Sequence, residues 1–231
     1  MRTGPVPVVY EDNHLLVVVK PANMPTQADA SGDPDLLTVM KAYVAEKYRK
    51  PGAVYLGLVH RLDRPVTGLV VLARTSKAAE RLSVQVREKT MNRQYLAVVR
   101  GTVPHTGELR DFLLKDERNN RVNVVPEGTG NAKEARLRYE RLAEDGEFSL
   151  VRVMLETGRS HQIRVQMMHA GFPLWGDARY GGGRPGEQIA LFGAHLELMH
   201  PTKKEPMAFT VLPEVRAPWN RFADCLASGI F

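Results

Sequence analysis

The chain has 231 residues, of which 43% are hydrophobic, and it carries a net charge of +6. This length suits one large domain or two small ones, and the apolar content allows a sizeable core. No apolar run reaches about 18 residues, so no membrane span is expected. A single cysteine, Cys225, excludes an internal disulfide and a cysteine-rich zinc site, and suits a reducing cytoplasm. The positive charge favours a polyanionic partner.

Hydrophobic periodicity predicts many strands and few helices. The expected strands cover residues 6–20 with a turn at 11–13, then 56–59, 69–73, 92–101, 133–157 as a hairpin, 189–201 and 206–213. The expected helices cover residues 35–49, 76–90 and 160–171. Strands that follow one another mostly as hairpins indicate an α+β fold with a mainly antiparallel mixed sheet and flanking helices.

Local signals place the ends of several elements. Ser76 is the expected N-cap of the second helix, and Ser160 and Gly171 are the expected cap and stop of the third. The dipeptide Asp-Gly at 145–146 predicts a hairpin turn. The acidic stretch 107–130 is the best candidate for an inserted lobe or a flexible surface region.

Positive charge is concentrated between Arg74 and Arg100, where seven basic residues stand against two acidic ones, a net charge of +5. Most such runs are solvated helix faces. A groove for nucleic-acid phosphates predicts the same count, so both interpretations stay open. Lys77 and Arg81 lie four residues apart on the expected helix and, with Arg74, are expected to share one face.

The most unusual segment is GLVHRLDRPVTGLVVLART, residues 57–75, in which charges interrupt two apolar strands. An unpaired buried charge is costly, so Asp63 must be paired, exposed in a cleft, or used in chemistry. An ion pair between Asp63 and Arg61, Arg64 or Arg164 would fix the bend without any catalytic role, and this alternative stays open.

A second polar turn, ETGRSHQIRVQ at 156–166, leads into the third expected helix. The N-terminus of a helix presents backbone N–H groups that favour a phosphate or a carboxylate. Arg164 lies one helical turn beyond Ser160, near enough to reach back toward that end.

Other chemistries lack their sequence signatures. The histidines are scattered without a tight ligand spacing such as HExxH, so no metal site is expected. The segment GGGRPGE at 181–187 lacks the GxxxxGK[ST] pattern of a phosphate-binding loop and indicates a plain loop. No GxSxG elbow or Cys–His pairing is present.

Five blocks of sequence, in order between Val8 and Pro213, resemble the RluA-type family of RNA pseudouridine synthases. The block HRLDRPVTGLVVLAR resembles the family signature HRLDxxTSGLLLLAK. The other four are LLVVVKPANMP, REKTMNRQYLAVVRG, LETGRSHQIRVQMMHAGFPLWGDARYG and LELMHPTKKEPMAFTVLP. One such match could arise by chance, but five in family order could not.

The resemblance implies an isomerase that converts specific uridines of ribosomal or transfer RNA to pseudouridine, with no cofactor. It implies the pseudouridine synthase fold, with a central catalytic cleft. We expect one catalytic domain over residues 1–231, without the separate N-terminal S4 domain that is frequent in the family. The expected state is a cytoplasmic monomer that binds RNA, with no membrane association and no protein partner indicated.

By their positions in these blocks, the resemblance implies that Asp63 is the catalytic aspartate, Tyr95 the active-site tyrosine, and Arg164 the arginine that pairs with the aspartate. Arg61 occupies the place of the residue that helps to displace the target nucleotide. The other residues expected to contact RNA or assist base flipping are His60, Arg64, Thr67, Lys77, Arg81, Arg159 and His161.

Two other functions compete with this interpretation. A catalytically silent RNA-binding or ribosome-assembly protein on the same fold could lose Asp63, Tyr95 or Arg164, yet all three are present. An unrelated carboxylate enzyme acting on glycosidic bonds would need a second acid. No carboxylate accompanies Asp63 in its turn.

Overall fold

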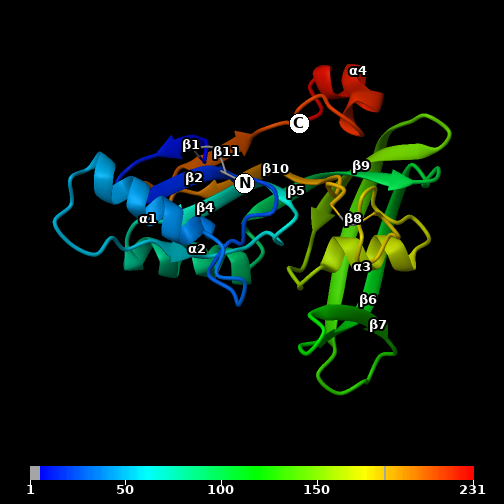
Figure 1. Ribbon diagram of the computed structural model, residues 1–231, viewed down its shortest axis with the longest axis horizontal. Helices are drawn as coiled ribbons and strands as arrows, with labels where there is room; N and C mark the ends of the chain where they lie inside the picture. Colours follow the sequence, from blue (N-terminus) through cyan, green and yellow to red (C-terminus); the bar gives the residue numbers. More distant parts are fainter. Residues whose placement is uncertain (1–5, 185) are drawn as a thin grey trace. The chain divides into compact units, whose positions relative to one another are not determined.

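The computed structural model describes residues 6–184 and 186–231, and the chain divides into two compact units (Figure 1). Unit 1 comprises the described residues up to Asn92 together with Gly193–Val211. Unit 2 comprises Arg93–Phe192 together with Leu212–Phe231. That the two units act as one catalytic domain stays a prediction. The expected loop at 181–187 includes Pro185, which lies outside the described residues.

The sheet of unit 1 is built from two segments that are distant in the sequence. Its strand order is β1 (Val8–Glu11), β2 (Leu15–Lys20), β4 (Thr67–Ala73) and β10 (Leu191–Met199). The short strand β3 (Gly57–Leu58) pairs with β4, and β11 (Pro206–Thr210) pairs with β10. The pairs β1–β2, β2–β4, β3–β4 and β10–β11 are antiparallel.

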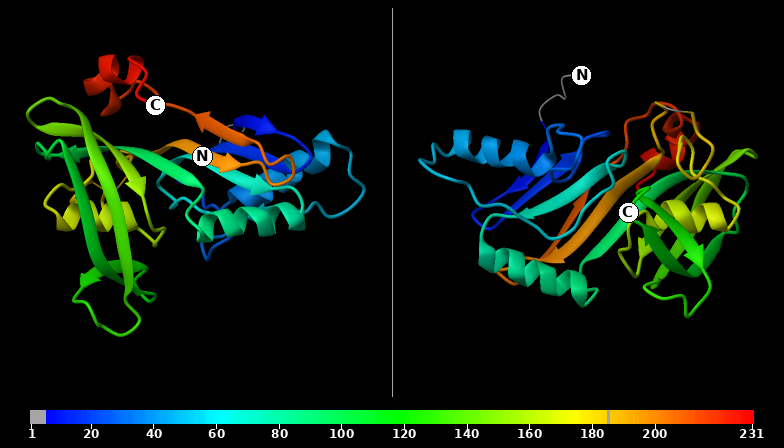
Figure 2. Two further views of the ribbon diagram at one scale, coloured as in Figure 1. Left: turned by 180° about the vertical axis from the view of Figure 1, so that it is seen from behind. Right: turned by 60° about the horizontal axis from the view of Figure 1, so that its bottom comes forward.

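Helices cover both faces of these strands. Figures 1 and 2 show α1 (Leu36–Lys47) and α2 (Ser76–Arg87) on opposite sides of them. On the α2 side, Leu82 packs with Leu15 and Val17 of β2. Leu16 and Val18 point to the other face because strand side chains alternate, and they too are fully buried. Burial on both faces explains why β2 is a continuous apolar run.

The cap of α2 differs by one residue from the prediction. Thr75, not Ser76, is the N-cap, and its side-chain oxygen accepts the N–H of Ala78 at 3.1 Å. Threonine and serine both cap helices through a hydroxyl oxygen, so the sequence does not show which of these two neighbours is the cap. At α1 the cap is Asp35, which accepts the N–H of Thr38 at 3.1 Å.

The sheet of unit 2 is a series of long antiparallel pairs. Its order is β5 (Asn92–Arg100), β9 (Phe148–Leu155), β8 (Lys133–Glu144), β6 (Thr106–Asp116) and β7 (Arg121–Val125). Helix α3 (Gln162–His169) packs on this sheet, with Val165 in a cluster that includes Leu113 and Ala135. The predicted turn at 145–146 connects β8 to β9, with Gly146 at φ +90°.

Two expectations for unit 2 were wrong or incomplete. The acidic stretch 107–130 is not a flexible surface region, because β6 and β7 pair with each other there and β6 also pairs with β8. Leu113 of β6 and Val122 of β7 are buried in the cluster under α3. The C-terminal turn η1 (Trp219–Phe222) and helix α4 (Ala223–Ala227) were not predicted.

The expected α+β class with a mainly antiparallel sheet is confirmed. Among the described residues, no helix has the length and apolar character needed to cross a membrane.

Candidate active site

The segment that carries Asp63 connects two antiparallel strands of unit 1, β3 and β4. Within it, the N–H of Val66 donates to the carbonyl of Asp63 at 3.0 Å and closes a tight turn. Leu62 and Val66 are buried on either side, whereas Asp63 is half-buried. The turn therefore holds Asp63 between two apolar anchors.

Thr26 fixes the residue before Asp63. Its hydroxyl donates to the carbonyl of Leu62 at 2.8 Å and accepts the N–H of Leu62 at 3.3 Å. Thr26 is itself buried, so this double contact is shielded from water. The sequence analysis did not identify Thr26, which lies 36 positions from Leu62.

Lys20, the last residue of β2, is fully buried beneath the same turn. Its Nζ donates to the carbonyls of Pro21 at 2.9 Å, Met24 at 2.8 Å and Arg64 at 3.1 Å. Burial lowers the pKa of Lys20 to about 7, while the negative charge of Asp63 acts in the opposite direction. Lys20 thus attaches the Asp63 turn to the end of β2 and places a titratable amine next to it.

Gly68 shows why the turn must be followed by glycine. Its φ is +138°, and a Cβ at this position would lie 2.4 Å from the backbone nitrogen of Gly193. Any side chain would collide with the backbone of β10, so a larger residue would displace the strand that starts at Thr67.

The structure places the other predicted residues of this segment in different environments. His60 is buried, and its Nε2 accepts the N–H of Val71 at 3.0 Å. Arg64 is exposed but contacts the preceding loop, where it donates to Ser31 at 2.9 Å and pairs with Asp33. Arg61 is exposed and Thr67 is half-buried.

The basic residues around α2 form a smaller surface than the sequence suggested. Arg74 does not share a face with Lys77, because it precedes the helix and its side chain is buried in an ion pair with Glu11 at 3.1 Å. Arg81 donates to the carbonyl of Pro201 at 2.5 Å. Lys77 is exposed.

Tyr95 lies in unit 2, in the buried part of β5 opposite Val153 of β9. The strand is polar before this residue and apolar after it, from Leu96 to Val99. The family pattern identified Tyr95, whereas its type and burial would also suit an ordinary core tyrosine.

The loop before α3 is closed by a glutamine and not by the expected serine. Ser160 does not cap α3. The N-cap is His161, at φ +53°, and its side chain makes no capping hydrogen bond. Instead, Oε1 of Gln162 accepts the N–H of Arg159 at 3.0 Å and the hydroxyl of Thr157 at 2.8 Å. Arg159 is exposed, and its Nε donates to the carbonyl of Glu134 at 2.9 Å.

Arg164 is buried on α3 and makes a two-point contact with Asp177. Its Nε lies 2.9 Å from Oδ2, and its Nη2 lies 2.8 Å from Oδ1. Burial would raise the pKa of Asp177, but the hydrogen bonds and charge of Arg164 outweigh this and lower it. The sequence analysis missed Asp177, although it is the aspartate of the quoted GDARYG block.

Further hydrogen bonds hold His161, at the start of α3, and Gln166, within it. The hydroxyl of Tyr180 lies 2.7 Å from Nδ1 of His161. Gln166 is fully buried, and its Nε2 donates to Asp111 at 2.8 Å and to the carbonyl of Ala135 at 3.3 Å. These contacts fix α3 to the sheet of unit 2.

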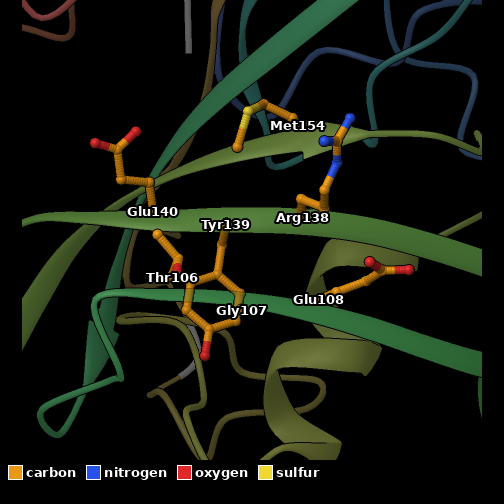
Figure 3. A pocket seen from close by; sticks show the side chains of 7 residues that line it. All are labelled: Thr106, Gly107, Glu108, Arg138, Tyr139, Glu140 and Met154. Atoms are coloured by element: carbon orange, nitrogen blue, oxygen red, sulfur yellow. The ribbon is translucent and has the colours of Figure 1, made fainter.

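A separate pocket of about 410 Å³ lies among the strands of unit 2 (Figure 3). It is lined by Thr106, Gly107, Glu108, Arg138, Tyr139, Glu140 and Met154. The ring of Tyr139 covers Gly107, where a Cβ would lie 2.4 Å from the ring. None of the residues singled out from the sequence lines this pocket, so we assign it no role in the reaction.

The predicted residues thus fall into two groups. Asp63, with His60, Arg61, Arg64 and Thr67, belongs to one segment of unit 1, and Lys77 and Arg81 lie on α2 of the same unit. Tyr95, Arg159, His161 and Arg164 belong to unit 2. The expected pairing of Asp63 with Arg164 stays a prediction. Among the described residues, no three histidine, cysteine, aspartate or glutamate side chains are grouped closely enough to hold a metal ion.

The chain is similar to enzymes that modify RNA. A model of the RNA pseudouridylate synthase family matches residues 14–169. The ribosomal large subunit pseudouridine synthase D of Zymomonas mobilis is 34% identical over 217 residues, which cover 89% of this chain and 68% of that protein. The ribosomal large subunit pseudouridine synthase C of Vibrio vulnificus is 32% identical over 91% of this chain and 65% of that protein.

Solved structures share the fold. Human RNA pseudouridylate synthase domain containing 4 superposes with a TM-score of 0.77 at 20% identity, over 96% of this chain and 93% of that one. Human RNA pseudouridylate synthase domain containing 1 gives a TM-score of 0.74 at 22% identity, over 99% and 98% of the two chains. The chain therefore belongs to the RluA-type family of RNA pseudouridylate synthases, isomerases that convert uridine in RNA to pseudouridine.

Proposed function

We propose that this chain modifies specific uridines of large-subunit ribosomal RNA and that Asp63 is the essential carboxylate. The names of the similar proteins from Zymomonas mobilis and Vibrio vulnificus support the choice of RNA. The family signature around Asp63 supports the choice of residue. Transfer RNA is the second candidate substrate, as the sequence analysis left open.

The reaction breaks the bond between N1 of uracil and C1′ of ribose, turns the base, and joins C5 to C1′. The atoms of substrate and product are the same, so no co-substrate is consumed. An ionised carboxylate is needed beside the ribose and the base. Asp63 would either attack the substrate directly or remove a ribose proton to form a glycal, and both routes need its charged form.

The other predicted residues have roles that follow from their chemistry. Arg164 would favour the ionised form of Asp63, because a neighbouring cation lowers the pKa of a carboxyl group. Tyr95 offers a ring for stacking on uracil and a hydroxyl for the proton that leaves C5.

The target nucleotide must leave its stack before it can react, at a cost of a few kcal/mol. Arg61, with its exposed side chain, would help to displace it. The basic residues that bind flanking phosphates offset part of this cost. His60, Thr67, Arg159 and His161 are kept as predicted contacts of the flipped nucleotide or its neighbours.

The observation that carries the proposal is the construction of the Asp63 turn. Apolar anchors and Thr26 hold its backbone, and Lys20 binds the carbonyl of the next residue, Arg64. Asp63 itself remains half-buried, so water and substrate can reach that residue. Such a fixed backbone around an accessible carboxylate-bearing residue suits a group that must meet its substrate in one geometry.

Asp63→Asn tests the proposal on large-subunit ribosomal RNA transcribed without modifications, with pseudouridines mapped at single sites. We expect no detectable product, while RNA affinity and the free energy of unfolding stay near wild type. Asp33→Asn is the control, because Asp33 is an exposed carboxylate that pairs with Arg64 in the same unit. It should leave the product yield unchanged.

Other outcomes would identify the competing functions. Activity of Asp63→Asn within about tenfold of wild type would remove the aspartate from the chemistry. A large loss of stability in Asp63→Asn would indicate a structural ion pair instead. A wild-type protein that binds RNA and modifies neither ribosomal nor transfer RNA would be the silent RNA-binding protein.

We further propose that the enzyme works in the cytoplasm as a monomer and a single catalytic domain. The single cysteine and the ribosomal targets named for its relatives support the location. Light scattering of the purified chain at micromolar concentration tests the oligomeric state, and a mass near twice 25.8 kDa would contradict the monomer.

A further inference from the structure

The Arg164 side chain is fixed in one orientation, which its positive charge alone would not require. Nε and Nη2 donate side by side to the two carboxylate oxygens of Asp177, at 2.9 and 2.8 Å. The side chains of both residues are almost completely buried. A guanidinium that donates through Nε and Nη2 has its plane fixed by the carboxylate, and its Nη1 group points away from Asp177.

Asp177 is itself fixed to the backbone. Its Oδ1 also accepts the N–H groups of Arg179 at 3.0 Å and Tyr180 at 3.2 Å. A carboxylate with these additional donors cannot rotate without breaking several hydrogen bonds at once. The backbone at 177–180 therefore fixes Asp177, and Asp177 in turn fixes the orientation of Arg164.

The ring of Tyr180 also limits the movement of the Arg164 guanidinium. Its ring centroid lies 5.1 Å from Cζ of Arg164. The ring is held at its far end, where the hydroxyl accepts the N–H of Val122 at 2.8 Å and lies 2.7 Å from Nδ1 of His161. Burial raises the pKa of Tyr180, so the hydroxyl keeps its proton.

We propose that Asp177 and Tyr180 are positioning residues of the isomerisation, which set the direction of the Arg164 guanidinium through the carboxylate and the ring. This inference rests on the proposed function, because it needs Arg164 to act in the reaction. The competing explanation is structural: the same contacts would only attach the 177–180 segment to α3, and the rate at saturating RNA would not depend on them.

Asp177→Asn separates these explanations when kcat and KM are measured with single-site pseudouridine mapping, at a temperature at which thermal unfolding shows the variant to be folded. Asparagine keeps the size of the side chain but replaces one acceptor of the Arg164 contact with a donor. We expect kcat to fall about 10- to 100-fold, because a misdirected catalytic group costs rate, with KM for RNA within about twofold of wild type.

Asp145→Asn is the matched control. Asp145 also lies in unit 2, receives Nε of Arg221 at 2.5 Å, and accepts the N–H groups of Glu147 at 3.0 Å and Phe148 at 2.8 Å. It thus has the same kind of partners as Asp177 but no contact with Arg164. The control should lose stability without losing kcat.

Tyr180 provides a second test that does not depend on the folding of Asp177→Asn. Tyr180→Phe keeps the ring and should retain kcat within about threefold, whereas Tyr180→Leu removes the ring and should lower kcat about tenfold. RNA affinity should be the same in both. Tyr180→Leu with the kcat of wild type would overturn the positioning role of the ring.

The measurements distinguish a wrong proposed function from a wrong positioning role. If the wild-type protein modifies no RNA, the proposed function fails and this inference fails with it. If the wild-type protein is active while Asp177→Asn and Tyr180→Leu keep its kcat, the proposed function stands and the positioning role is wrong.

Discussion

Lys20 and Asp63 show how the environment of one residue depends on another that is distant in the sequence. Lys20 ends an apolar strand and is completely buried, yet its ammonium group has three backbone carbonyl acceptors. One acceptor belongs to Arg64, the residue after Asp63. A buried amine with these acceptors fixes the turn, and its depressed pKa of about 7 makes it titrate near neutral pH.

Lys20→Met tests this depressed pKa through stability. The unfolded chain binds more protons than the folded chain between about pH 7 and pH 10.5, so Lys20 makes the free energy of unfolding rise with pH in that window. The difference in unfolding free energy, wild type minus Lys20→Met, should therefore increase from pH 7 to pH 9 in urea titrations. A difference that stays flat over this range would mean that Lys20 titrates near its ordinary pKa.

Tyr95→Phe tests the role of a single hydroxyl. The phenylalanine ring can still stack on uracil, so RNA affinity should be unchanged. The proton leaving C5 loses its carrier, and kcat should fall about 100-fold, within the range of general acid–base effects. Rates come from single-turnover assays with unmodified ribosomal RNA. Full activity of Tyr95→Phe would limit Tyr95 to forming a wall of the site.

At the scale of elements, α2 shows that a basic segment is not the same as a basic surface. The spacing of Arg74, Lys77 and Arg81 suggested that they share one face. In the structure, Arg74 pairs with Glu11 and stacks on the ring of Tyr48, whose centroid lies 4.5 Å from its Cζ. Arg81 binds the carbonyl of Pro201. Of the three residues expected to share a face, Arg74, Lys77 and Arg81, Lys77 is the exposed one.

Lys77→Gln should lower the slope of log affinity against log salt by about 0.7 to 0.9, the effect of one phosphate contact. Arg81→Gln should instead lower the free energy of unfolding by about 1 kcal/mol, because it removes a hydrogen bond within the protein. Filter binding between 50 and about 200 mM salt measures the slope. Lys203→Gln, an exposed charge between β10 and β11, serves as the control.

An unchanged slope in Lys77→Gln would mean that this face of α2 is only a solvated surface. The rate at saturating RNA should be unaffected in all three variants, since none of these residues belongs to the proposed chemistry.

At the scale of the whole molecule, unit 1 consists of two segments that are separated in the sequence by most of unit 2. His200 makes one of the contacts between the two segments of unit 1. Its Nε2 lies 2.8 Å from Oδ2 of Asp12, 188 positions away. Nδ1 of His200 accepts the N–H groups of Thr202 at 3.1 Å and Lys203 at 2.8 Å. Nε2 therefore carries the hydrogen and donates a hydrogen bond to Asp12.

Acid should weaken this long-range contact. Burial raises the pKa of Asp12, but the N–H groups of His14 and Leu15 and the ring of His200 lower it to about 2, below the ordinary 3.8. Asp12 therefore contributes stability above about pH 4, and this contribution of about 2 kcal/mol is lost as the pH falls through about 2.

Urea unfolding of wild type and Asp12→Asn between pH 2 and about pH 6 measures this contribution. The pH-dependent part of their difference in unfolding free energy should be present at pH 6 and vanish near pH 2. A difference that does not change with pH would contradict the lowered pKa.

The sequence by itself determined the elements and the family. Alternating and helical apolar patterns predicted most strands and three helices, because secondary structure follows local periodicity. It singled out Asp63 as a candidate, since charges between two apolar strands require an explanation, and five ordered blocks identified the family. It missed the C-terminal helices, where the buried Trp219 and Phe222 are too few to form a periodic pattern.

Only the tertiary structure decided which side chains support these residues. Thr26 and Lys20 contact the Asp63 turn from 36 and 44 positions away in the chain. Asp177 contacts Arg164 from the loop that follows α3, 13 positions later. It also removed Arg74 from the basic face by pairing it with Glu11. Sequence patterns record the period of a single element, whereas burial and pairing depend on which elements the fold brings together. The partners of buried charges therefore appear only once the chain is folded.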